Sequence, residues 1–176
     1  LYMKPWFGFH STRLFAMGDA RGNNIYGDNN NETGYAPYCL FTDKPNTPGL
    51  ADAWNSLYIV VTQADYIIND YAPQGRQHFS EAQANACEGE ARFMRAAAYY
   101  YLASYWHDVP IMENPIAHTE AFNMAPTRFE DVIRYGIRDL EYAAEWLPLA
   151  DADGRVTRYS ALGLLARYYV CLLYTS

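Results

Sequence analysis

The chain has 176 residues, enough for one domain that buries roughly 70% of its unfolded surface. Its net charge is −7 and its lysines are Lys4 and Lys44 alone, which argues against a nucleic-acid partner and against a polybasic membrane surface. No apolar run reaches the roughly 20 residues that a membrane-spanning helix needs. The three cysteines form no Cys-x-x-Cys or Cys-x-x-His motif, so we expect no metal and no cofactor.

The first 53 residues are expected to hold an aromatic helix and a long irregular segment. The helix is predicted from about Pro5 to Phe15, because proline suits the first position of a helix. Residues 19–53 are rich in Gly, Asn, Asp and Pro and have no helical period. Long segments of this kind are functional or disordered, and the aromatic residues in this one favour an ordered loop.

The loop over residues 19–53 is the candidate binding site. Amide and carboxylate groups stand beside aromatic rings in it, and this combination suits a sugar, which needs polar partners for its hydroxyls and flat apolar surface for its ring. Taken alone, each residue also fits a simple turn, because Asn and Gly favour turns. The ligand-binding residues predicted here are Asp19, Arg21, Asn23, Tyr26, Asn31, Tyr35 and Tyr38.

Apolar residues at three- and four-residue steps predict two helices in the middle of the chain. The first runs from Trp54 to Tyr71, with Asp52 as a candidate cap. The second begins after Ser80, a good N-cap, and ends near His107. This second helix is apolar on two faces, so we expect it to be buried between neighbours and to hold Cys87 as a small buried hydrophobe.

Two further helices are predicted in the last third of the chain, from Phe129 to Trp146 and from Thr157, as cap, to about residue 173. On the outer face of the first, Glu130 is spaced to pair with Arg134, and Arg138 with Glu141.

Charged residues inside the central helix are interpreted as structural. Glu88 and Glu90 point about 200° apart on a helix, so they form no acid/base pair, and Glu88 is expected to make a surface pair with Arg92. Ion pairs with adjoining helices are favoured over ligand contacts for Glu90, Arg92 and Arg95, because unpaired buried charge is costly. No nucleophile motif surrounds any of the four histidines, and the chain is predicted not to be an enzyme.

The central helix also carries a family resemblance. Residues 89–115, GEARFMRAAAYYYLASYWHDVPIMENP, resemble the signature helix of SusD/RagB proteins, the glycan-binding outer-membrane lipoproteins of Bacteroidetes. His107 departs from that pattern, which usually has glycine there. The resemblance extends over roughly residues 54–173, and Trp54-x-x-Leu57 echoes the first helix of a tetratricopeptide (TPR) repeat.

The resemblance implies an all-α fold of TPR-like antiparallel helix pairs with a long irregular N-terminal loop segment. Residues 1–176 would form a single partial domain of a SusD-like fold. Its parts would be the aromatic helix and recognition loop (1–53), the first helix pair (54–110) and the second helix pair (127–174). We expect the chain to be an internal fragment that lacks the lipid-carrying N-terminal cysteine and the C-terminal half.

The resemblance also implies a function. The protein would bind oligosaccharide at the cell surface, tethered to the outer membrane by a lipid anchor outside this fragment, and deliver it to a TonB-dependent SusC-like transporter. Two other classes stay open. A TPR-type protein-interaction module would have no sugar affinity, and a helical glycoside hydrolase would need two carboxylates roughly 5–9.5 Å apart, a pair that the sequence does not indicate.

Overall fold

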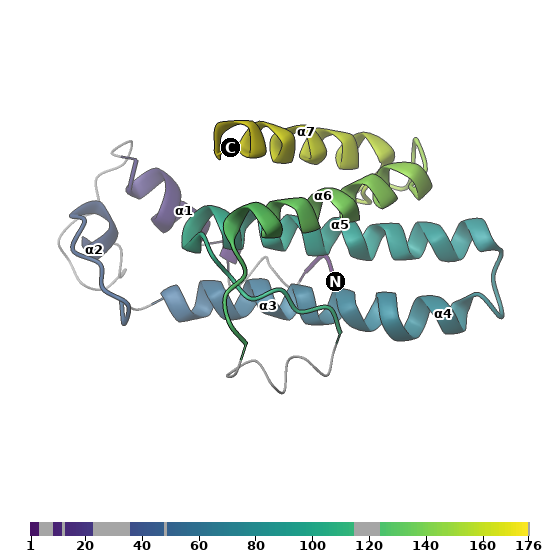
Figure 1. Ribbon diagram of the computed structural model, residues 1–176, viewed down its shortest axis with the longest axis horizontal. Coiled ribbons are helices and arrows are strands. Elements are labelled where there is room, and N and C mark those ends of the chain that lie inside the picture. The colour runs from purple at the N-terminus through teal and green to yellow at the C-terminus, as the bar shows by residue number, and fades with distance from the viewer. Residues whose placement is uncertain (4–8, 12, 23–35, 48, 115–123, 176) are drawn as a thin grey trace. The chain divides into compact units, whose positions relative to one another are not determined.

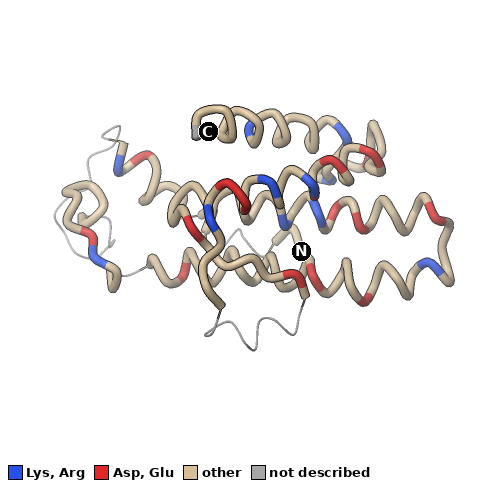
Figure 2. The backbone as a smooth tube through the Cα atoms, viewed as in Figure 1, with Lys and Arg blue, Asp and Glu red and all other residues tan. Residues whose placement is uncertain are grey.

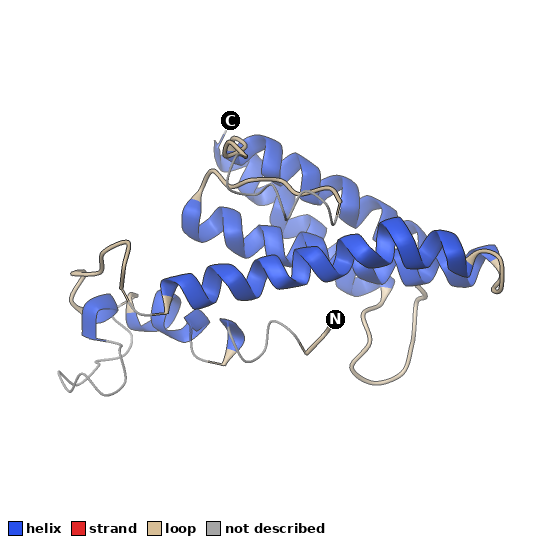
Figure 3. Cartoon of the chain, turned by 90° about the horizontal axis from the view of Figure 1, so that it is seen from below, coloured by secondary structure: helices blue, strands red, loops and turns tan. Residues whose placement is uncertain are grey.

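The computed structural model describes residues 1–3, 9–11, 13–22, 36–47, 49–114 and 124–175. These residues form two compact units, Tyr2–Ile59 and Val60–Ser176, and Leu1 belongs to the second. Within the described ranges the chain consists of helices and loops without strands (Figure 3). The all-α prediction is therefore confirmed, whereas the single partial domain stays a prediction.

The N-terminal unit contains short helices. Helix α1 (Arg13–Phe15) runs directly into the π-helix η2 (Ala16–Ala20), and η2 packs against α2 (Ala36–Cys39). The start of the helix predicted from Pro5 lies outside the described residues. Its predicted end at Phe15 is wrong, because both Phe15 and Arg21 keep helical backbone angles and the helix continues through η2.

Helix α3 (Leu50–Tyr66) begins four residues before the predicted Trp54. Gly49, at φ 95°, makes the left-handed turn that starts it. Asp52 is consequently inside the helix and does not cap it; its carboxylate instead lies 3.2 Å from Arg13 Nη2.

The helical backbone also continues past the predicted end at Tyr71. The π-helix η3 (Ile67–Tyr71) follows α3, and α4 (Ala72–Gly75) follows η3. Pro73 does not stop the run, because it lies in the first turn of α4, where a missing N–H costs no hydrogen bond. Both η3 and α4 pack against the next long helix.

Helix α5 (Glu81–Trp106) is the predicted central helix, and its start is fixed by a capping box. Ser80 Oγ accepts the Gln83 N–H at 3.3 Å, and Gln83 Oε1 accepts the Ser80 N–H at 3.1 Å. Every side chain from Glu88 to Ala103 is buried or partly buried, as expected for a helix with neighbours on several faces. Cys87 differs from expectation, since it is exposed in the more solvated first half of the helix.

Helix α6 (Phe129–Trp146) has the predicted bounds and packs against both α5 and α7 (Arg158–Thr175), as Figure 1 shows. Its inner face buries Val132, Ile133 and Leu140 completely or nearly so. Tyr168 of α7 is fully buried, and its hydroxyl donates to the Ala96 carbonyl of α5 at 2.6 Å. The predicted TPR-like helix pairs are thus confirmed.

A turn centred on His107 ends α5 and contacts the first residue of α6. His107 has φ 65°, in the region that favours glycine, and its ring stacks on Phe129 with centroids 4.8 Å apart. Asp108 Oδ1 accepts hydrogen bonds from His107 Nδ1 at 2.8 Å and from the Phe129 N–H at 2.9 Å. These two bonds, the first being the stronger influence, lower the pKa of Asp108.

We expect His107→Gly to raise the free energy of unfolding by about 1 kcal/mol, because a non-glycine residue at this backbone angle carries about 1–3 kcal/mol of strain. The lost stacking and hydrogen bond, both exposed, offset only part of that gain. Thermal unfolding measures the effect. His107→Ala is the control, since it keeps the strain and loses the ring; a glycine variant no more stable than the alanine variant would show that the turn is not strained.

Candidate functional site

The structure places three of the seven predicted ligand-binding residues. Asp19 lies exposed in η2, and Arg21 lies exposed directly after it. The Tyr38 side chain, in α2, is fully buried, and burial raises its pKa. A buried ring presents no face to a sugar, so this placement does not favour stacking by Tyr38. Four predicted site residues lie outside the described residues: Asn23, Tyr26, Asn31 and Tyr35.

An exposed aromatic residue follows α2 in the predicted recognition loop. Phe41 is 64% exposed and has φ 53°, which is rare for a bulky residue and directs its ring away from the preceding helical turn. The Arg21 guanidinium lies 5.6 Å from the centre of that ring, and Arg21 Nη1 lies 3.2 Å from Asp43 Oδ2. We refer to Arg21, Phe41 and Asp43 as the Phe41 patch.

The Phe41 patch has the chemistry that the sequence led us to expect of the loop. An aromatic face can stack on the apolar face of a sugar ring, while a guanidinium and a carboxylate bind its hydroxyls. Arg21 was among the predicted residues, but Phe41 and Asp43 were not. Their only sequence signal is their place in the same loop, and no spacing rule joins Arg21 to residues twenty or more positions later.

A second concentration of charge lies inside the C-terminal unit, where acidic and basic residues occur together along α5 and α6 (Figure 2). Arg95 forms a forked pair with Asp139, with Nε–Oδ2 at 2.7 Å and Nη2–Oδ1 at 2.8 Å, and its Nη1 lies 2.7 Å from Asp65 Oδ1. Burial alone would lower the pKa of Arg95, but the hydrogen bonds and charge of Asp139 raise it above its ordinary value. Arg95 therefore stays charged.

Three other charged groups of α5, Glu88, Glu90 and Arg92, are paired as well. Arg92 contacts Glu88 at 2.8 Å and Asp139 at 3.0 Å, and Glu90 pairs with Arg155. The predicted structural role of Glu90, Arg92 and Arg95 is confirmed. Glu88 was expected at the surface, yet it is buried, because Arg76 from outside α5 also pairs with it at 3.0 Å and removes the cost of burial.

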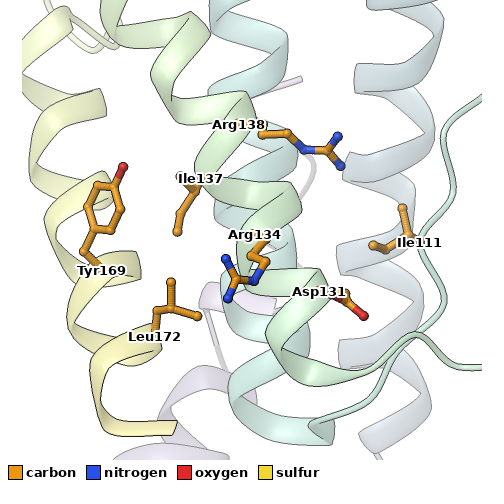
Figure 4. Close-up of a pocket in the computed structure, with 7 residues that line it drawn as sticks. All are labelled: Ile111, Asp131, Arg134, Ile137, Arg138, Tyr169 and Leu172. Atoms are coloured by element: carbon orange, nitrogen blue, oxygen red, sulfur yellow. The ribbon is translucent and has the colours of Figure 1, made fainter. Parts of the chain in front are cut away.

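A hollow of about 670 Å³ lies over α6 (Figure 4). Arg134 and Arg138 of α6 stand one helical turn apart in it, and α7 forms one side. Figure 4 shows the Arg134 guanidinium on the side of Leu172 and the Arg138 guanidinium on the side of Ile111. We refer to this surface as the α6 hollow, which is lined by Ile111, Asp131, Arg134, Ile137, Arg138, Tyr169 and Leu172.

The acids expected to pair with these two arginines have other partners. Glu130 lies 3.7 Å from Arg128, and Glu141 accepts a hydrogen bond from the Tyr169 hydroxyl at 3.0 Å. The predicted pairs of Glu130 with Arg134 and of Arg138 with Glu141 are therefore wrong. Among the residues that the structure describes, neither arginine of the hollow has a carboxylate within ion-pair distance.

Among the residues that the structure describes, no group of three or more His, Cys, Asp and Glu side chains is arranged to hold a metal ion. None of the helices described by the structure is long and apolar enough to cross a bilayer.

Stacked antiparallel helix pairs define the class as a TPR-like helical protein. A SusD-like family model, described as starch-binding and associating with the outer membrane, matches residues 12–170. The chain belongs to this SusD-like family.

Individual relatives agree with this assignment. A SusD-like protein from Bacteroides ovatus is 32% identical over 170 residues, which cover 97% of this chain and 30% of the relative. A crystal structure with xylogluco-oligosaccharide is 31% identical, has a TM-score of 0.82, and is matched over 94% of this chain and 32% of its own. A laminarin-binding SusD-like protein, 24% identical with a TM-score of 0.80 over 96% of this chain and 36% of its own, shares the fold. The chain thus spans about a third of these relatives' lengths.

Proposed function

We propose that this chain is part of a cell-surface glycan-binding protein and that its N-terminal unit supplies an oligosaccharide-binding surface. The observation that carries the proposal is the match of 94% of the chain, at 31% identity, to a protein crystallised with xylogluco-oligosaccharide. The protein binds the glycan and does not cleave it. This reading is preferred to a TPR-type protein-interaction module because the exposed ring of Phe41, between a guanidinium and a carboxylate, suits a sugar.

The Phe41 patch is the centre of the proposed binding surface. Phe41 stacks on a sugar ring, and Arg21 and Asp43 bind hydroxyls at its edge. Asp19 and the other predicted loop residues, Asn23, Tyr26, Asn31 and Tyr35, belong to the same proposed surface. Tyr38 supports the surface from within, since its carbonyl accepts the Phe41 N–H at 3.4 Å.

The proposal extends to location and partner through the family. The protein is a lipoprotein exposed on the outer membrane, held there by a lipid outside residues 1–176. It passes its oligosaccharide to a SusC-like TonB-dependent transporter. Co-purification of the natural protein with such a transporter is the direct test of this partner.

We expect Phe41→Ala to weaken binding of a xylogluco-oligosaccharide about tenfold, because an aromatic stacking contact is worth about 1–1.5 kcal/mol beyond area burial. Isothermal titration calorimetry of the natural protein measures this. Leu40→Ala is the matched control, because Leu40 is the exposed neighbour of Phe41 without a ring and its loss should leave affinity unchanged.

Two results would count against the proposal. Unchanged affinity in Phe41→Ala would remove the Phe41 patch from the site. A parent protein that binds peptides but none of a panel of neutral oligosaccharides would support the protein-interaction module instead.

A further inference from the structure

We infer that the α6 hollow binds acidic sugars, with Arg134 and Arg138 each holding the carboxylate of a uronic acid. The inference rests on the proposed glycan-binding function and adds a substrate class to it. It concerns a surface of the C-terminal unit, so it is independent of the Phe41 patch.

The first observation is that neither arginine of the hollow has an acid partner among the described residues; the Arg138 guanidinium instead lies 5.5 Å from the centre of the Tyr135 ring. The chain has a net charge of −7, and most of its arginines form ion pairs with acidic residues. Arg134 and Arg138 keep no such partner among the described residues, because Glu130 and Glu141 are engaged elsewhere. Arginines that form ion pairs with described acids are Arg13, Arg21, Arg76, Arg92, Arg95, Arg128 and Arg155.

The second observation is how the two guanidinium groups are placed. They lie one helical turn apart in sequence, and in Figure 4 they point to opposite sides of the hollow. Guanidinium groups that point to opposite sides suit carboxylates on different rings of an oligosaccharide better than one small anion. A guanidinium binds a carboxylate through two parallel hydrogen bonds, which gives each position its specificity.

The third observation concerns the other side chains that line the α6 hollow. Tyr169 is 42% exposed, and the bond of its hydroxyl to Glu141 restrains its ring at the side of the hollow. Ile111 and Leu172, both partly exposed, add apolar surface for the C–H faces of sugar rings. Asp131 supplies an acceptor for sugar hydroxyls. The side chains that line the hollow, with two arginines and one aspartate, have a net charge of +1. The hollow, at about 670 Å³, is within the range of roughly 300–1,000 Å³ found for ligand sites.

The test compares two probes with the same sugar backbone, trigalacturonic acid, which is charged, and its fully methyl-esterified form, which is neutral. In calorimetric titrations of the natural protein at low salt, we expect the acid to bind at least tenfold more tightly than the ester. The double variant Arg134→Gln/Arg138→Gln should lose about a hundredfold in affinity for the acid, because it removes two charge-assisted pairs that are each worth about one decade. Its affinity for neutral xylogluco-oligosaccharide should not change.

Arg167→Gln is the matched control, since Arg167 is an exposed arginine of α7 that does not line the hollow. It should leave both affinities unchanged. Equal affinity for acid and ester, or a double variant that binds the acid as the parent does, overturns the inference. Tighter binding of tetraglutamate than of trigalacturonate also overturns it, in favour of an acidic protein segment.

The same titrations separate this inference from the proposed function. Acid binding that depends on Arg134 and Arg138 supports the inference even if Phe41→Ala leaves neutral binding intact. Neutral binding that depends on Phe41, together with no preference for the acid, supports the proposed function and overturns the inference.

Discussion

Replacing Asp139 by alanine should lower the free energy of unfolding by about 3–5 kcal/mol, the usual cost of breaking a buried ion pair from one side. Asp139 is 2% exposed and holds both guanidinium groups of α5, with contacts of 2.7 and 2.8 Å to Arg95 and of 3.0 Å to Arg92. Its removal leaves Arg95, which is 4% exposed, with Asp65 as its remaining acid. The Nε and Nη2 groups of Arg95 would then be buried without the carboxylate that accepts their hydrogen bonds.

Denaturant unfolding followed by circular dichroism measures this loss. The matched control is Glu145→Ala, an exposed acid on the same helix, which should change stability by about 0.5 kcal/mol or less. Asp139→Asn should lie between the two, because it keeps the volume and some hydrogen bonds but not the charge. If Asp139→Ala unfolded like Glu145→Ala, the charge cluster would not be what joins α5 to α6.

Gly136→Ala should destabilise the protein by about 2–3 kcal/mol, although alanine normally favours a helix over glycine by about 1 kcal/mol. A Cβ at position 136 would lie 2.4 Å from the ring and hydroxyl of Tyr168. That ring is fully buried, and it cannot retreat without losing its hydrogen bond to the Ala96 carbonyl. Steric conflict and the lost bond thus outweigh the gain in helix propensity.

Gly163→Ala is the natural counterpart for this variant. Gly163 lies in α7, and a Cβ there meets no described atom within 4 Å. We therefore expect it to gain about 0.5–1 kcal/mol from helix propensity. The two substitutions are chemically the same and should move the melting temperature in opposite directions; a shared direction would mean that α7 does not pack on Gly136 as described.

The helices predicted most accurately are those whose bounds are indicated by residues close together in the sequence. The bounds of α6 agree with the prediction, because its apolar period is unbroken from Phe129 onward. The start of α5 follows from Ser80 and Gln83, a pair that can be read from four consecutive residues. The ends of α3 were missed because Gly49 starts the helix earlier and π-helical turns carry it through Pro73.

Features that depend on distant partners could not be predicted. The burial of Glu88 requires Arg76, twelve residues away and outside α5. Arg138, three residues before Glu141, was its predicted partner, but the Glu141 carboxylate accepts a hydrogen bond from Tyr169 of α7 instead. Arg138 lines the α6 hollow, with its guanidinium 5.5 Å from the centre of the Tyr135 ring.

The candidate site stays a prediction, made for the loop as a region and for seven named residues, of which the structure describes three. The loop before α3 does carry a sugar-compatible patch, and Arg21 is in it. Composition indicated aromatic rings in the loop but did not distinguish the buried Tyr38 from the exposed Phe41, three residues later. The short helix α2 makes that difference, because it turns Tyr38 inward before the left-handed Phe41 ends the turn.

A crystal structure of the natural protein with a bound xylogluco-oligosaccharide tests the proposed glycan-binding surface most directly. Our account predicts a sugar ring stacked on Phe41, with hydroxyls in hydrogen-bond contact with Arg21 and Asp43. A well-ordered oligosaccharide bound elsewhere, with the Phe41 ring still facing solvent, would contradict it.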